Sequence, residues 1–343
     1  MQVFFSFCYI CTNFKCMEQG LYPLKFLPLF KNKPWGGNKI RDLLGVDYSP
    51  LPNCGELWVL SAIEGQETVV ENGFLTECTL PELIEMYADE LVGEENYKEF
   101  GEYFPLLFKI IDAQDNLSVQ VHPDDDFAQN NGYPNGKTEM WYVMDNQEDA
   151  IIYSGWNKKM TKSEVINKTK DGTIAECLNC DKVEKGDLFF IPAGRVHAIG
   201  KNSLVAEIQQ SSDTTYRLFD WNKKDENGTG RKLHIEEALK VLDLNHTHHS
   251  KSGYDYTLNK TSNLLTTPFF TTNLISINLG LKKDYSTLDS FVVLFCTSGE
   301  GYVEAMGHKV PIKASEVILL PAICQEANII PKGLLEILEV FIV

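Results

Sequence analysis

The residues with the clearest chemical potential lie at the ends of apolar segments. In the stretch NLSVQVHPDDDF, Gln120 and His122 share one face of a strand, because residues two apart in a strand point the same way. Glu139 stands where another strand begins, and His197 follows the strand GDLFFIP and the turn AGRV. One amide, two imidazoles and one carboxylate form an N/O donor set suited to a borderline divalent ion such as zinc.

Each of these residues also has a simpler interpretation. An isolated histidine beside a turn is more often a surface or core residue than a metal ligand, and a glutamate at the start of a strand is more often solvated. The metal interpretation is favoured because His122 and His197 both fall in a pattern of short strands and turns that could aim them inward.

The elements that must position these residues are mostly strands. Short segments rich in Val, Ile, Phe and Tyr alternate with Gly, Asn, Asp and Pro turns, a pattern typical of a sandwich or barrel. The exception is 79–101, where Thr79 can cap a helix, Pro81 fits its first turn and apolar residues recur at helical spacing. A second helix is predicted over 234–242. The sequence therefore predicts a mainly β protein with few helices.

An internal repeat divides the chain. GDLFFIPAGRVHAI and SEVILLPAICQEANI both run from an acid through four apolar residues to a proline, and His197 of the first falls opposite Glu326 of the second. A polar stretch at 245–263 separates the two halves. This pattern predicts two related β-barrels, with the metal-type residue kept only in the first.

The predicted domains follow from this repeat. Residues 17–244 should form a catalytic barrel with a helical insertion near 79–101, and 245–343 a second barrel without a metal site. The first residues, 1–16, are apolar but lack the basic start and small-residue cleavage site of a signal peptide. We expect them to be a non-native or disordered extension, with translation starting at Met17.

Composition limits the classes of partner. The chain has 343 residues and a formal charge of −17, which disfavours binding to nucleic acid or to an anionic membrane surface. It contains no apolar run of about 18 residues, so no membrane span is predicted. Nine cysteines, an odd number, lie scattered along the chain. These features predict a reduced, cytoplasmic protein without a disulfide framework.

A family resemblance adds to this interpretation. Gly186, Pro192, Gly194 and His197 match the second half of the cupin signature, whereas Gln120 stands where the commonest cupins carry a histidine. That departure is the pattern of the type I phosphomannose isomerases, which the sequence resembles over most of its length from about residue 21. The shared segments are KPWGGNKI, GELWVLSA, FPLLFKIIDAQDNLSVQVHPDD, GKTEMWYV, PAGRVHAIG and VAEIQQSSDTTYRLFDWNKK.

The resemblance implies a fold, a cofactor and an activity. The fold would be two cupin-type jelly-roll barrels, and the residues matching the family's zinc ligands are Gln120, His122, Glu139 and His197, for one zinc ion per chain. The activity would be interconversion of D-mannose 6-phosphate and D-fructose 6-phosphate through an enediol. Such a reaction needs a base, a positive field and an anchor for phosphate.

Three residues are candidates for the chemistry. Arg217 ends a Ser-Asp-x-x-x-Arg segment that matches the family and can hold oxyanions, although a salt bridge with Asp213 is the structural alternative. Lys137 shares the face of Glu139; by itself it would be a solvated turn lysine. By resemblance, Glu207 matches an acid proposed for proton transfer, with Lys137 or a water on the metal as rivals for that role.

Four residues are candidates for binding the substrate. Ser118 shares the face of Gln120, and its family counterpart contacts phosphate. Lys109 is a cation in an apolar strand, costly unless it is paired with an anion. Lys223 lies six residues after Arg217, where eukaryotic members carry a lysine, but the intervening residues differ. The fourth candidate is Asp213.

Two other functions remain open from the residues alone. His122, Asp124 and His197 also spell the facial triad of iron(II) oxygenases, although Pro123 should turn Asp124 away and Glu139 would be left without a role. A two-barrel sugar-binding protein without activity is the third possibility. The expected partner is a small sugar phosphate, and the expected state is a monomer or weak homodimer.

Overall fold

The computed structural model describes residues 20–224 and 227–342, and the expectations for 1–16 and Met17 lie outside them. The chain folds into two compact units. We call residues 30–58 and 106–253 the central unit, and the described residues of 20–29, 59–105 and 254–342 the terminal unit. In the described part of the chain, no helix has the length and apolar character needed to cross a membrane.

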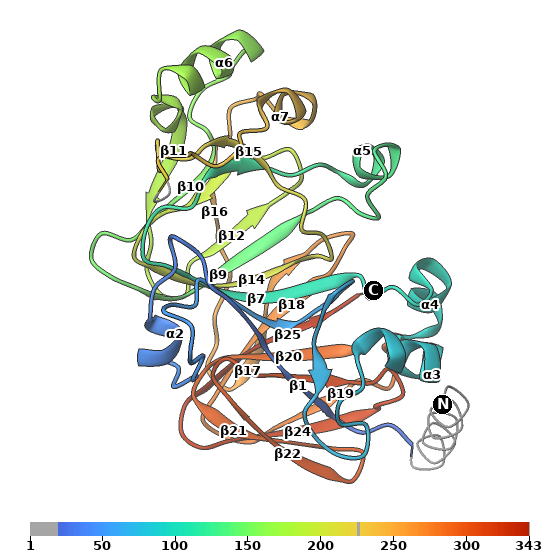
Figure 1. Ribbon diagram of the computed structural model, residues 1–343. Helices are drawn as coiled ribbons and strands as arrows, with labels where there is room; N and C mark the ends of the chain where they lie inside the picture. The colour runs from blue at the N-terminus through green and yellow to red at the C-terminus, as the bar shows by residue number, and fades with distance from the viewer. Residues whose placement is uncertain (1–19, 225–226, 343) are drawn as a thin grey trace. The chain divides into compact units, whose positions relative to one another are not determined.

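The central unit contains two antiparallel sheets (Figure 1). The seven-stranded sheet has the order β16 (Lys251–Ser252), β12 (Leu188–Ile191), β9 (Glu139–Asn146), β14 (Ser203–Gln210), β7 (Leu106–Ala113), β3 (Glu56–Leu60) and β2 (Leu29–Lys31). The five-stranded sheet has the order β11 (Leu178–Lys182), β10 (Ile151–Trp156), β13 (His197–Ile199), β8 (Val119–Val121) and β15 (Tyr216–Phe219). A core that includes Trp141, Phe189 and Ile199 lies between them.

Alternation along β8 explains how one strand serves two environments. Val119 and Val121 join a second apolar cluster on the outer face of the five-stranded sheet, whereas Gln120 between them points the other way. Helices cover that outer face through Val165 and Ala238. The helices of this unit are α2 (Lys39–Asp42), α5 (Asp125–Asn130), α6 (Lys162–Lys170), the 3₁₀ turn η1 (Ile174–Cys177) and α7 (Ile235–Val241). The helix expected over 234–242 is therefore confirmed.

The terminal unit is also built of two antiparallel sheets. The larger has the order β17 (Lys260–Thr266), β18 (Thr271–Ile277), β25 (Leu335–Phe341), β20 (Val292–Ser298), β23 (Val317–Leu320), β1 (Leu24–Leu27) and β6 (Val69–Val70). The smaller has the order β19 (Leu281–Asp284), β24 (Glu326–Pro331), β21 (Glu300–Ala305) and β22 (His308–Lys313), and a two-stranded hairpin is formed by β4 (Ala62–Ile63) and β5 (Gln66–Glu67). Apolar side chains from the larger and the smaller of these sheets form one core. The mainly β, two-barrel expectation is confirmed.

The helical segment expected at 79–101 is present as α3 (Leu80–Val92) and α4 (Glu94–Phe100). Thr79 and Glu82 form a capping box at the start of α3, with Pro81 in the first turn. The backbone N–H groups of Glu94 and Glu95 donate to the carboxylate of Asp289 at 2.8 and 3.0 Å. These bonds connect the helical segment to the C-terminal part of the chain. We expected this segment in the same domain as the rest of 17–244, whereas the compact units place it with 254–342.

The two copies of the repeat present opposite faces. β13 begins at His197 and β24 at Glu326, as the matched sequences predict. His197 is fully buried, whereas the Glu326 side chain is 58% exposed and lies 2.7 Å from Lys282, with Ala327 taking the inward position. A one-residue change of phase reverses every side chain of a strand. The polar residue of the second barrel therefore faces solvent.

Candidate active site

Three ligand-type side chains converge inside the central unit. His122 follows β8, Glu139 begins β9 and His197 begins β13, and all three are buried. Their nearest ligand atoms all lie within 4.8 Å of one another. Glu139 Oε2 is 3.6 Å from His122 Nε2, and Glu139 Oε1 is 3.3 Å from His197 Nε2. Strand ends from both sheets thus bring together residues that are distant in sequence.

Backbone carbonyls orient both imidazole rings. His122 Nδ1 lies 2.9 Å from the carbonyl oxygen of Thr214, and His197 Nδ1 lies 2.8 Å from that of Arg195. A ring that donates from Nδ1 keeps the lone pair of Nε2 for a metal. Burial lowers the pKa of His197 to about 3, and burial, helped by the charge of Lys137, lowers the pKa of His122 well below its usual value. Both rings are therefore neutral near pH 7.

The buried carboxylate of Glu139 is poorly satisfied by the protein. Neither of its oxygens accepts a hydrogen bond from the described residues, and His197 Nε2 also lacks a partner. Burial raises the pKa of Glu139 to about 7, although Lys137, whose Nζ is 3.3 Å from Oε2, opposes that rise. Unpartnered buried polar atoms are costly, and a cation bound among them would remove the cost. The donor set therefore fits a divalent metal ion.

Gln120 lies in the middle of β8, between the neighbouring strands β13 and β15. It lies opposite His197 of β13 on one side and opposite Arg217 of β15 on the other. Its neighbour Ser118 lies 3.5 Å from Gln120 Oε1 and accepts a hydrogen bond from Arg217 Nε at 3.2 Å. Ser118, Gln120 and Arg217 thus line one space, and Ser118 and Gln120 share the face that their spacing predicts.

That space is a cavity of about 290 Å³ in the central unit. Its lining is rich in charge of both signs. The charged residues around it are Lys33, Glu56, Lys109, Lys137, Glu207, Asp213, Arg217 and Arg231. Five cations against three acids make this a place where a small anion can bind among apolar and amide groups.

Lys109 is held by protein groups beside this cavity. Its Nζ lies 3.2 Å from Glu207 Oε1 and donates to Gln209 Oε1 at 2.8 Å. Burial opposes its charge, but Glu207 and Glu56 raise the pKa of Lys109 above its usual value. Trp141 Nε1 donates to the other oxygen of Glu207 at 2.8 Å. The anion that this buried cation requires is therefore Glu207.

Arg217 makes a different set of contacts from the salt bridge considered above. It donates from Nε to Ser118 and from Nη1 to the carbonyl oxygen of Lys232 at 2.9 Å. Burial lowers the pKa of Arg217, but a guanidinium remains charged at neutral pH. Asp213 lines the same cavity.

The structure does not bring every predicted residue to the cavity. Lys223 lies outside its lining, where its Nζ is 2.8 Å from Asp115 and donates to the carbonyl oxygen of Asn116. Asp124 is exposed and caps α5 by accepting from the backbone N–H of Phe127 at 2.8 Å. Asp124 is thus used by the helix, as the turn at Pro123 suggested.

Three charged residues of the cavity were not selected from the sequence. Lys33 and Glu56 pair at 3.1 Å, and both belong to segments, KPWGGNKI and GELWVLSA, that carry the family resemblance. Arg231 binds Asp220 through two nitrogens, one of them Nε at 2.7 Å from Oδ2. No motif marks Arg231 in the sequence, so only the fold could reveal it.

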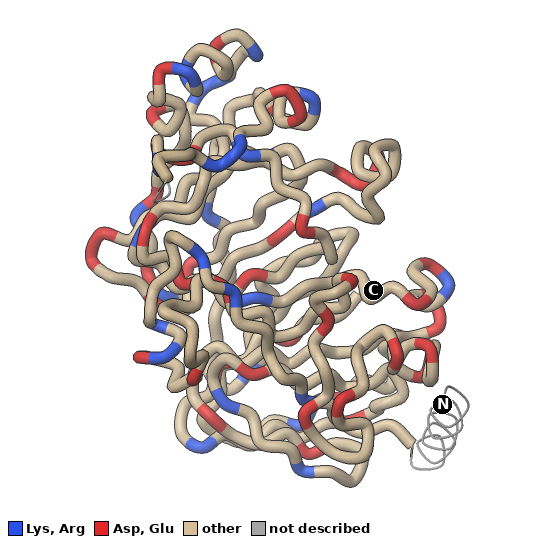
Figure 2. The backbone as a smooth tube through the Cα atoms, in the orientation of Figure 1, with Lys and Arg blue, Asp and Glu red and all other residues tan. Residues whose placement is uncertain are grey.

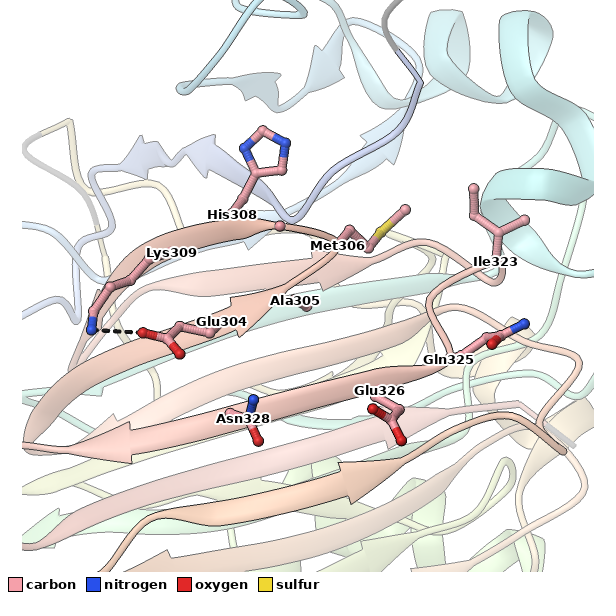
Figure 3. Close-up of a pocket in the computed structure, with 10 residues that line it drawn as sticks. Glu304, Ala305, Met306, His308, Lys309, Ile323, Gln325, Glu326 and Asn328 are labelled. Carbon is pink, nitrogen blue, oxygen red and sulfur yellow. Dashed lines mark ion pairs between the residues drawn. The ribbon is translucent and has the colours of Figure 1, made fainter.

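A larger cavity, of about 790 Å³, lies on the terminal unit (Figure 3). Its polar residues include Glu304, His308, Lys309 and Glu326. Glu304 and Lys309 pair with each other at 2.7 Å, as Figure 3 shows, and Glu326 pairs with Lys282. Within the described residues, the only group of three or more metal-type side chains is the one in the central unit. The volume of a cavity alone therefore does not identify the candidate active site.

The chain is similar to known proteins over most of its length. The family profile "Phosphomannose isomerase type I, catalytic domain" matches residues 24–161. The chain is 38% identical to mannose-6-phosphate isomerase ManA of Bacillus subtilis, over 87% of this chain and 93% of that relative. It is 35% identical to the mannose-6-phosphate isomerase of Streptococcus mutans, over 87% and 92% of the two chains. The crystal structure of a Bacillus subtilis mannose 6-phosphate isomerase superposes with a TM-score of 0.83 at 30% identity, covering 94% of this chain and all of that one.

Proposed function

Because the chain belongs to the type I phosphomannose isomerase family and is a mannose-6-phosphate isomerase, we propose that it works with one zinc ion and forms an enediol intermediate. The reaction would interconvert D-mannose 6-phosphate and D-fructose 6-phosphate. The observation that carries the proposal is the convergence of His122, Glu139 and His197 beside a cavity rich in cations.

The residues that would hold zinc are Gln120, His122, Glu139 and His197. Neutral imidazole nitrogens with a carboxylate and an amide oxygen suit a borderline ion. The buried oxygens of Glu139 and Nε2 of His197, which form no hydrogen bond with the described residues, support this assignment. Bound there, zinc would supply positive charge that favours oxyanion character on the sugar.

Phosphate binding is proposed for the cationic wall of the cavity. Arg231 offers a guanidinium group, which matches the geometry of phosphate oxygens, and Lys33 adds a second charge. The Ser118 hydroxyl is placed by Arg217 and can donate to the same anion. Lys223 would reach the phosphate only after leaving Asp115, so we keep it as a secondary candidate for binding the substrate. Asp213 lines the cavity and is kept as a further candidate for binding the substrate.

The proton transfer needs a group beside the sugar carbons. Glu207 lines the cavity, and its carboxylate is fixed by Lys109 and Trp141, which supports it as the base. Lys137 is the alternative, because its Nζ lies within 3.3 Å of both Glu139 Oε2 and His122 Nε2. Arg217 would stabilise the negative charge that develops on the enediolate oxygens.

The oxygenase alternative has less support. It requires Asp124 to join His122 and His197, but Asp124 caps α5 and is exposed. A non-catalytic sugar-binding role has less support, because the relatives that the chain matches over most of its length are mannose-6-phosphate isomerases. We therefore retain the isomerase as the single proposal.

The expected partner is a small sugar phosphate, without nucleic acid or membrane. Lys and Arg are interspersed with Asp and Glu in the view of Figure 2, which supports this expectation because polyanion-binding proteins gather their basic residues. A cytoplasmic location and a monomer or weak homodimer complete the proposal.

The test is isomerisation followed by NMR in D₂O. With D-mannose 6-phosphate, we expect D-fructose 6-phosphate to appear with solvent deuterium incorporated at C1, because the base removes the C2 proton and the enediol is then protonated at C1. Unphosphorylated mannose is the matched control and should react far more slowly, because the cationic wall then has no anion to hold. A properly folded, zinc-loaded protein that leaves both sugar phosphates unchanged would refute the proposal.

A further inference from the structure

We propose that Trp141 is a positioning residue that holds the Glu207 carboxylate and the His197 ring in fixed relation to each other. The inference rests on the proposed function, in which Glu207 transfers the proton and His197 binds the metal. Trp141 itself does not line the cavity and is fully buried. It would act only through the two residues that it contacts.

The register of three strands sets up this arrangement. Glu207 of β14 lies opposite Lys109 of β7 on one side and opposite Trp141 of β9 on the other. Lys109, Glu207 and Trp141 thus form one row across the sheet. Directly paired side chains on one face of an antiparallel sheet lie close enough to contact each other. The row is fixed by backbone hydrogen bonds rather than by loops.

Glu207 is held from both sides of this row. The indole Nε1 donates to Oε2 at 2.8 Å, and the ammonium of Lys109 lies 3.2 Å from Oε1. Lys109 is in turn fixed by Gln209, whose amide nitrogen donates to the carbonyl oxygens of Gln210 and Ser212. A carboxylate with a neutral donor on one oxygen and a cation on the other has one preferred rotation.

The same indole ring contacts the candidate metal centre. The ring centroids of Trp141 and His197 lie 5.2 Å apart at 77°, an edge-to-face contact. The His197 ring is also held at Nδ1 by the carbonyl oxygen of Arg195, and it contacts the His122 ring and Glu139 on the side of the candidate metal centre. Because an indole is rigid, any shift of Trp141 would move Glu207 and His197 together. Groups that react together need placement to a fraction of an ångström, so this coupling has catalytic value.

The experiment separates the two contacts. Trp141→Phe keeps an aromatic ring near His197 but removes the donor to Glu207. We expect kcat to fall about 10- to 100-fold with KM within about threefold, zinc content unchanged, and a larger isotope effect with substrate deuterated at C2. Trp141→Leu removes both contacts, and should in addition weaken zinc binding, measured by competition with a chromophoric chelator, about tenfold.

The matched control is Trp156→Phe. Trp156 is as deeply buried in the same unit, and its Nε1 donates at 2.8 Å to the carbonyl oxygen of Asp243. A purely structural effect of losing a buried indole donor should be similar in both variants. We expect Trp156→Phe to lower the melting temperature without changing the isotope effect.

A coupling measurement completes the test. In a Glu207→Gln background, Trp141→Phe should change kcat by less than about threefold, because the residue that it positions is already disabled. If Trp141→Phe does not fold, benzothienylalanine at position 141 keeps the bicyclic shape and replaces the N–H by sulfur. If the wild type is active and kcat is unchanged by Trp141→Phe or by benzothienylalanine at position 141, the inference alone is overturned. If the zinc-loaded wild type is inactive, the proposed function is overturned.

Discussion

Glu139 and His197 stand at the first positions of two strands that belong to different sheets, and Glu139 Oε1 lies 3.3 Å from His197 Nε2. The pair therefore joins the two sheets of the central unit at the candidate metal centre. Each sheet fixes its own residue through backbone pairing, Glu139 opposite Ile191 and His197 opposite Gln120. A metal ion bound there would depend on the packing of the whole barrel.

Removing one carboxylate at a time should distinguish a ligand from a helix cap. Glu139→Ala should abolish stoichiometric zinc, measured by elemental analysis of the purified protein. Asp124→Ala should keep the metal and cost about 1 kcal/mol of stability, because it removes the cap of α5. Loss of metal in Asp124→Ala with retention in Glu139→Ala would favour the oxygenase triad instead.

The buried pair of Lys109 and Glu207 should be far more sensitive than an exposed pair. Lys109→Met leaves the Glu207 carboxylate uncompensated and should cost about 3–5 kcal/mol of unfolding free energy in urea. Adding Glu207→Gln should restore most of that stability, because no buried charge is then left alone. Lys223→Met, which removes the half-exposed pair with Asp115, should cost less than about 1 kcal/mol. Equal losses in the two single variants would contradict this account.

Asp112 should make stability depend on pH. Burial raises its pKa to about 6 from the usual 3.8, although the backbone N–H of Lys39 donates to Oδ2 at 2.6 Å. The folded protein therefore holds a proton that the unfolded chain loses first. Its stabilising effect is complete below about pH 4 and is lost as the pH rises through 6.

The matched variant for this effect is Asp112→Asn, which can still accept from Lys39 but does not titrate. Between pH 4 and 7.5, the free energy of unfolding of the wild type should fall by about 3 kcal/mol relative to that of Asp112→Asn, because raising a pKa by about two units corresponds to that energy. Urea unfolding at several pH values measures the difference. A difference that stays constant over this range would show that Asp112 does not titrate as described.

Local patterns in the sequence were enough to select the candidate metal residues. Gln120, His122, Glu139 and His197 stand at strand ends or on one face of a short strand, and period-two alternation predicts such positions without knowledge of the fold. Thr79 likewise marked a helix start because capping is a local interaction. These predictions needed only neighbours in the chain.

Other features depend on contacts that no local pattern specifies. Arg231 reaches the cavity from a segment without strand or helix pattern, and its pairing with Asp220 is tertiary. The partner of Lys109 is set by the register of β7 and β14, so the sequence indicated that an anion was needed but not that it was Glu207. Equal spacing also failed to predict that Glu326 faces outward, because a single residue changes the phase of a strand.

The most direct test of the zinc-dependent isomerase is turnover of D-mannose 6-phosphate before chelation, after chelation and after zinc is restored. We predict about one zinc per chain in the active protein, loss of both metal and turnover with a strong chelator, and recovery of both on adding zinc. Full turnover by protein shown to contain no metal would contradict the central claim.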